Sequence, residues 1–291
     1  MNTADRSLPL SFLPLTPIGR QKLYALLVLI AQAAIAVTGS IVRVTGSGLG
    51  CASWPECHPG SFVPVAGEAE MLHQIIEFGN RLLTFVLVAL TLLLFLSVMR
   101  VGRRQEIKLL AFLNGLGVIV QAVIGGISVW VDLKWYAVAL HFLPSMILVW
   151  LAGMLFVKIS EPDDGTATRM YPRYLRYLAA ASGLALTMTL ITGTMVTGAG
   201  PHAGDASVLP EDRLQLPIVD LAHIHAGFMY LYLGLVIGLI FGLLASEAFA
   251  PVRKVAIALV VFILAQGVVG MIQYWSCLLY TSDAADDSLR V

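Results

Sequence analysis

Four histidines and one glutamate lie in stretches of the sequence that are otherwise strongly apolar. His73 and Glu77 share one stretch, and His141, His223 and His225 follow in two later ones. Imidazole suits iron, copper and zinc, and histidines on facing helices are the usual ligands of a heme iron. A carboxylate beside them could accept or release a proton. These residue types therefore point to a heme or metal site with acid–base chemistry.

The spacing around Glu77 places polar groups on one side of a helix. His73, Glu77 and Asn80 lie at helical intervals and share one face. Plainer interpretations stay open, because a membrane histidine can serve as a hydrogen-bond partner between helices. Glu77 could likewise form an ion pair with Arg81, one turn later. Zinc is disfavoured because the set contains no compact motif such as His-Glu-x-x-His.

The elements that must position these residues are membrane-spanning helices. The chain has 291 residues, of which 58% are hydrophobic and 12% charged, and its formal net charge is zero. A soluble domain carries about 25% charge, so a soluble enzyme, a disordered protein and a nucleic-acid binder are excluded. Continuously apolar runs of about 20 residues predict α-helical spans, not a β-barrel. We expect seven spans, at 23–42, 71–98, 109–130, 135–157, 175–197, 218–245 and 255–275.

Basic residues predict the orientation of these spans. With the N-terminus in the cytoplasm, thirteen of the 18 Lys and Arg residues fall in inner segments and three in outer loops. Positive charge is enriched on the cytoplasmic side of membrane proteins, so a cytoplasmic N-terminus is predicted. The helical rise then places the histidines and Glu77 in the outer third of the bilayer.

Two halves of the chain are related in sequence. The motif TGSIV begins at Thr38 and TGTMV at Thr192, while QAVIG begins at Gln121 and QGVVG at Gln266. Order and spacing agree, as in parallel repeats of membrane proteins. We interpret the small residues in and beside these motifs as helix-packing positions; they are Gly39, Gly125, Gly126, Gly193 and Gly270.

The repeat also relates the polar residues of the two halves. Asn80 corresponds to His225, which favours His225 over His223 as the site residue of its span. The counterpart of His141 falls at Asp286, in a polar tail. The second half therefore lacks the eighth span that the first half predicts for it.

Two cysteines lie in the loop between the first two spans. Cys51 and Cys57 flank Trp54-Pro55 on the predicted outer side, where a disulfide can form. The pair could form a disulfide that only stabilises the loop, or it could have a redox or docking role. Both interpretations stay open.

These features resemble the heme A synthase family of cytochrome oxidase assembly. The resemblance covers roughly residues 20–275. It rests on RVTGSGLGC ending at Cys51, with Trp54, Pro55 and Cys57 after it, on EFGNR from Glu77, on QAVIGG from Gln121 and on ALH ending at His141.

The family has eight helices in two four-helix halves, each with paired histidines. It oxidises a methyl group of heme O to the formyl group of heme A by successive hydroxylations. One half processes the substrate heme and the other holds heme b. The resemblance implies that Glu77 is the catalytic carboxylate, that His141 and His225 are heme-iron ligands in the first and second halves, and that Cys51 and Cys57 form a disulfide.

The chain departs from the family pattern at two places. Many members have histidine where this chain has Asn80, so His73, two turns earlier on the same face, becomes the substitute ligand candidate. His223 and Arg81 are kept as further site candidates. Residues 276–291 are acidic where a span is expected, and they resemble translated adaptor sequence joined to a truncated reading frame. We expect this tail to be non-native.

The predicted organisation follows from these features: an all-α polytopic membrane protein of two pseudo-symmetric four-helix halves, with seven spans present. The segments are a cytoplasmic N-terminal segment (1–22), a first half (23–157) with an outer cysteine loop (43–70), a cytoplasmic linker (158–174), a three-helix second half (175–275) and the tail (276–291).

The expected function is heme A synthesis in the bacterial plasma membrane, with heme O as substrate and heme b as cofactor. Expected partners are an unidentified electron acceptor, heme O synthase and oxidase assembly factors, with homo-oligomerisation left open and no nucleic acid. Two alternatives are a non-catalytic b-type cytochrome and a transporter built from the repeat. A transporter would need spans broken by Gly or Pro near the midplane, and only Pro144 is a candidate break.

Overall fold

The structure is a computed structural model that describes residues 13–165, 171–201, 204–205, 207–246 and 250–279. Every long element within these residues is an α-helix, which confirms the predicted all-α fold. The helices are α1 (Ile18–Val44), α2 (Met71–Val101), α3 (Gln105–Trp130), α4 (Trp135–Lys158), α5 (Arg173–Ala199), α6 (Ile218–Ala245) and α7 (Ala250–Gln273). A short 3₁₀ segment (Pro210–Asp212) precedes α6, and a π-helical segment (Tyr274–Leu279) follows α7.

Each of the seven helices is long and apolar enough to cross a membrane. Large apolar side chains on their outer surfaces are exposed, for example Phe85 at 71% and Phe262 at 71%. Such exposure is unfavourable in water, but lipid tails are as apolar as these side chains. The chain is therefore a multi-pass membrane protein, as predicted. Most of the expected tail, including Asp286, lies outside the described residues.

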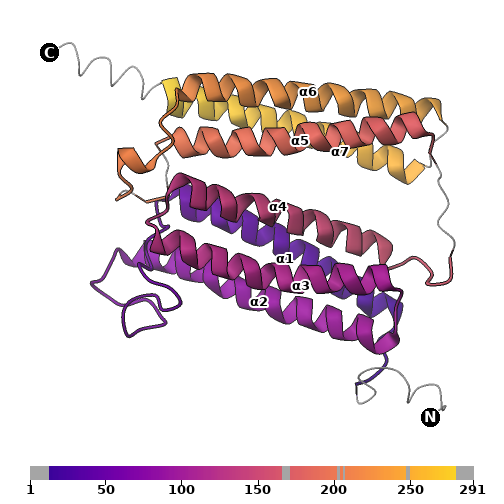
Figure 1. Cartoon of the computed structure of the whole chain (residues 1–291), viewed down its shortest axis with the longest axis horizontal. Helices are drawn as coiled ribbons and strands as arrows, with labels where there is room; N and C mark the ends of the chain where they lie inside the picture. Colours follow the sequence, from indigo (N-terminus) through magenta and orange to yellow (C-terminus); the bar gives the residue numbers. More distant parts are fainter. Residues whose placement is uncertain (1–12, 166–170, 202–203, 206, 247–249, 280–291) are drawn as a thin grey trace. The chain divides into compact units, whose positions relative to one another are not determined.

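Helices α1 to α4 form a first compact unit (Figure 1). Both α1 and α3 pack against α2 and α4, so α2 and α4 occupy opposite corners of the bundle. The largest apolar core of this unit lies toward the end where α2 ends and α3 begins. It includes Leu94, Val98, Ile107 and Leu155. The loop that carries the cysteines lies at the opposite end, where α1 ends and α2 begins.

Helices α5, α6 and α7 form a second unit, in which α6 packs against both α5 and α7. Ala185, Tyr232, Val236 and Ile263 form its main buried apolar cluster. This unit is built from three long helices in the part of the chain that the structure describes.

Part of the segment between α5 and α6 is grouped with the first unit, namely the described residues between 204 and 213. Two contacts account for this grouping. The Gly48 amide donates a hydrogen bond to the Gly204 carbonyl (2.8 Å), and Lys134 pairs with Asp212 (3.5 Å).

A buried arginine joins segments at the end of the first unit where α2 meets α3. The Arg103 side chain is 1% exposed and donates hydrogen bonds to Gln21 Oε1 (2.9 Å) and to the carbonyls of Ile159 (3.0 Å) and Glu161 (3.0 Å). It also pairs with Asp163 at 2.7 Å. The turn between α2 and α3 is thereby tied to the segment that follows α4.

Candidate functional site

Glu77 lies in the second turn of α2 and is almost fully buried, at 5% exposure. The backbone amide of Cys51 donates a hydrogen bond to its Oε2 atom at 2.6 Å. Arg81, one helical turn later, donates from Nε to Oε1 at 3.0 Å and forms an ion pair with the same oxygen through Nη2. Both carboxylate oxygens therefore have partners, and the ion pair considered for Glu77 is present.

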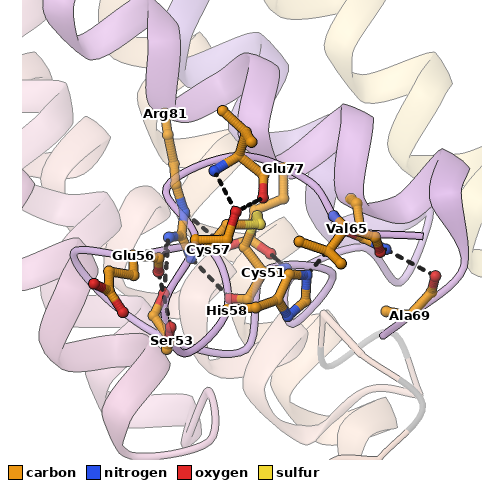
Figure 2. Close-up of a disulfide and its surroundings, with 12 residues drawn as sticks. Cys51, Ser53, Glu56, Cys57, His58, Val65, Ala69, Glu77 and Arg81 are labelled. Carbon is orange, nitrogen blue, oxygen red and sulfur yellow. Dashed lines mark hydrogen bonds and ion pairs between the residues drawn. A yellow bond between two sulfur atoms is a disulfide. The ribbon is translucent and has the colours of Figure 1, made fainter. Parts of the chain in front are cut away.

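Arg81 also binds the loop that carries the cysteines. Its Nη2 donates to the Cys51 carbonyl (2.8 Å), and its Nη1 donates to the carbonyls of Ser53 (2.8 Å) and Glu56 (3.1 Å). Figure 2 shows Glu77, Arg81 and the two cysteines gathered around these contacts. The guanidinium fork thus joins a helix carboxylate to three loop carbonyls, a geometry that lysine cannot reproduce.

The structure joins Cys51 and Cys57 in a disulfide, as expected. Both cysteines are buried, at 0% and 1% exposure. The disulfide closes the short segment whose carbonyls and Cys51 amide contact Arg81 and Glu77 (Figure 2). In this arrangement the bridge shapes a binding surface for the Glu77–Arg81 pair, which is a structural role.

Two further contacts hold this loop, and the sequence did not suggest either. Trp54 lies on Gly126 of α3, where an added Cβ would stand 2.3 Å from the indole ring. Trp130 packs edge-on against Trp54, with ring centroids 5.5 Å apart, and donates from Nε1 to the Trp54 carbonyl at 3.1 Å. The Gly126 position had been interpreted as helix packing only. Its neighbour is in fact the loop tryptophan.

Gln74 makes the second of these contacts. It is fully buried and accepts hydrogen bonds from His58 Nε2 (2.9 Å) and the Val65 amide (2.8 Å), while its own amide donates to the carbonyls of Val65 (2.9 Å) and Ala69 (2.8 Å). Because the Gln74 oxygen is the acceptor, His58 carries its proton on Nε2. His58 therefore holds the later part of the outer loop against the first turn of α2.

The two histidines predicted for the first half have different surroundings. His73 is partly exposed, and its Nε2 lies 3.7 Å from Glu70 Oε2 just before α2. His141 on α4 lies against Gly125 of α3, where an added Cβ would stand 3.0 Å from Cε1. Its Nδ1 atom is buried without a hydrogen-bond partner among the described residues. No hydrogen bond within the described residues joins His73 to His141.

In the second unit His225 is held by its Nδ1 atom. That atom donates to the Thr189 carbonyl at 3.0 Å and lies 3.3 Å from Thr192 Oγ1. A proton fixed on Nδ1 leaves Nε2 as a free electron-pair donor, the arrangement that orients metal-binding histidines. His223 is exposed and lies 6.1 Å from the Tyr274 ring, centroid to centroid.

The threonines beside these residues are equivalent in the two halves. Thr38 on α1 donates to Asn80 Oδ1 at 2.7 Å, just as Thr192 on α5 contacts His225. Both threonines begin the repeated motif, so the repeat could have identified them. Among the described residues, no group of three or more His, Cys, Asp or Glu side chains could hold a metal ion.

Comparison with known proteins identifies the family. Residues 22–213 match the family described as cytochrome oxidase assembly protein. The chain belongs to this family. The matched segment begins within α1 and runs through α5 to residue 213, so it includes Glu77 and His141 and ends before His225.

Several curated proteins similar in sequence to the chain are named heme A synthase. The protein of Macrococcus caseolyticus is 32% identical over 148 residues, which cover 49% of this chain and 48% of the relative. That of Lysinibacillus sphaericus is 30% identical over 195 residues, 65% of this chain and 61% of the relative. That of Geobacillus kaustophilus is 33% identical over 144 residues, 49% of this chain and 44% of the relative. The chain thus spans about half the length of the curated relatives it matches.

Proposed function

We propose that the chain acts as a heme A synthase, oxidising the methyl group of heme O to the formyl group of heme A for cytochrome c oxidase assembly. Its family and the names of its curated relatives support this function. The heme O substrate would lie in the first unit, where the matched segment carries both Glu77 and His141.

The observation that carries the proposal is the setting of Glu77. A carboxylate buried at 5% exposure is costly unless it is paired, and here Arg81 and the Cys51 amide supply its partners. Oxidation of a methyl group releases protons, and Glu77 would accept one at its carboxylate while Arg81 keeps the side chain in place. The heme supplies the redox chemistry when bound. The protein supplies orientation and a route for protons.

The imidazoles in the two units fit a heme role. His141 presents a buried nitrogen with no hydrogen-bond partner in the described residues, and His225 has its Nε2 free for iron. His141 would hold the heme of the first unit, and His225 would hold a heme b in the second.

The setting and partners of this activity follow from the same proposal. The bacterial relatives favour a bacterial plasma membrane, and the charge distribution favours a cytoplasmic N-terminus, which would place Glu77 near the outer face. An electron acceptor must then be reached from that side, and heme O synthase must supply the substrate.

Replacing Glu77 with glutamine tests the proposal. General acid–base catalysis contributes about 100-fold or more, so we expect Glu77→Gln to lower the heme A yield by at least about that factor while bound heme is retained. The measurement is heme extraction from membranes of a host that supplies heme O. The matched control is Glu68→Gln, at an exposed glutamate of the outer loop. An undiminished yield in Glu77→Gln would remove Glu77 from the mechanism.

One observation favours a second candidate, a b-type cytochrome. The orientation of His225 suits an electron-transfer heme and requires no catalysis. Such a protein would bind heme without making heme A, with or without Glu77.

A further inference from the structure

The two units differ at one equivalent side chain. Thr38 and Thr192 begin the same repeated motif, and each contacts a residue on the next helix. In the second unit this residue is His225, whereas in the first unit it is Asn80. Asn80 therefore occupies the structural position of an imidazole ligand but carries a carboxamide.

Asn80 is a poor iron ligand in this setting. Imidazole suits iron, while neutral carbonyl oxygens suit harder ions such as magnesium and calcium. The Asn80 oxygen also already accepts the Thr38 hydroxyl at 2.7 Å. Any use of that oxygen as a ligand would have to compete with this hydrogen bond.

His73 is badly placed to replace the missing imidazole. It lies two turns before Asn80, about 10 Å away along the α2 axis at 1.5 Å per residue. Its backbone is covered by the outer loop, because an added Cβ at Gly50 would stand 2.6 Å from the His73 carbonyl carbon. Its side chain faces Glu70 at the start of the helix. This arrangement disfavours the substitution that the sequence suggested.

His58 is held by Gln74, so among the described residues His141 is the imidazole that remains for the first unit. It lies on α4, at the corner opposite α2, and its ring is fixed against Gly125. A side chain larger than glycine at position 125 would stand within 3.0 Å of the ring. The ring is thus held in one place with a buried nitrogen that has no hydrogen-bond partner in the described part of the chain.

We infer that the first unit binds heme through His141 alone and leaves the second axial position of the iron open to an added ligand. This inference rests on the proposed heme-binding function. It distinguishes the chain from a protein in which two histidines close both axial positions. An iron with one imidazole is high-spin and binds carbon monoxide when reduced, whereas an iron with two imidazoles is low-spin and does not.

The test is spectroscopy of the full chain carrying His225→Ala, so that only the first unit contributes. The purified protein is reconstituted with heme b, and its ferric electron paramagnetic resonance and ferrous carbon monoxide difference spectra are recorded. We expect a high-spin signal and stoichiometric carbon monoxide binding. His141→Ala should abolish both. Asn80→His should convert the signal to low-spin and suppress carbon monoxide binding at least tenfold.

Two matched variants separate the inference from simple structural effects. Asn80→Gln keeps a carboxamide and should remain high-spin, and His73→Ala should leave both spectra unchanged. A low-spin signal before any change at Asn80, or loss of the signal in His73→Ala, would overturn the inference while heme binding stands. Failure of the chain with His225 intact to bind heme would overturn the proposed function, and the inference with it.

Discussion

Arg81 is the residue that contributes most contacts to the shape of the candidate site. It pairs with Glu77 and binds the carbonyls of Cys51, Ser53 and Glu56. The sequence placed Arg81 one turn after Glu77, which left their pairing open as an alternative role for the carboxylate. It could not predict the three carbonyl contacts, because these depend on how the disulfide-closed loop folds back over the helix.

Replacing Arg81 should therefore destabilise the site, by different amounts for glutamine and for lysine. Arg81→Gln leaves Glu77 without its counter-charge, and breaking a buried ion pair costs about 3 kcal/mol or more. Arg81→Lys keeps the charge but not the fork, so a smaller loss is expected. The measurement is the thermal unfolding midpoint of the detergent-solubilised chain. Equal midpoints for Arg81→Gln and the unaltered chain would show that the pair adds nothing to stability.

At the scale of elements, adjacent glycines on α3 serve two different neighbours. Gly125 makes room for the His141 ring, and Gly126 for the Trp54 ring. Of the glycines predicted to pack helices, these two do allow a close approach, whereas nothing lies within 4 Å of an added Cβ at Gly39 or Gly270. The partners are a histidine and a loop tryptophan instead of another backbone, and sequence periodicity carries no information about loop partners.

Gly126→Ala should loosen the cysteine loop. Its new Cβ would stand 2.3 Å from Trp54, and overpacking of this kind costs about 1–3 kcal/mol. We expect a lower unfolding midpoint and faster reduction of the Cys51–Cys57 disulfide by a mild thiol. Gly153→Ala on α4 is the control, because nothing lies within 4 Å of its added Cβ. Identical reduction rates in the two variants would contradict the anchoring role of Trp54.

The segment after α4 gives a prediction about pH. Burial raises the pKa of Asp163, but hydrogen bonds from the Arg104 amide and the Arg103 side chain outweigh that effect, so the pKa lies below its ordinary value. A lowered pKa in the folded state stabilises the fold above the unfolded pKa of about 3.9. The contribution disappears as the pH falls through the folded pKa.

Asp163→Asn should accordingly lower stability near neutral pH and have no effect in strong acid. The side chain is 44% exposed, so solvent screening limits the loss to about 1 kcal/mol or less. The measurement is the difference in unfolding midpoint from the unaltered chain across an acid titration, with the exposed neighbour Asp164→Asn as control. A difference in unfolding midpoint that grew toward acid pH would contradict a lowered pKa of Asp163.

For the whole molecule, composition and span length were sufficient to predict seven apolar helices, because burying backbone groups in lipid permits few alternatives. The position of 202–213 was not predictable, since the bonds from Gly48 to Gly204 and from Lys134 to Asp212 join segments far apart in the sequence. The repeat did relate Asn80 to His225, and the equivalent threonine contacts support that relation. The orientation in the membrane stays a prediction.

The most direct test of the central proposal is heme extraction from membranes of a host that makes heme O but no heme A, with and without this chain. Heme A is expected in the membranes that contain the chain, and it should be lost in Glu77→Gln. Bound heme with heme O unconverted in membranes that contain the unaltered chain would contradict heme A synthesis and favour a non-catalytic cytochrome.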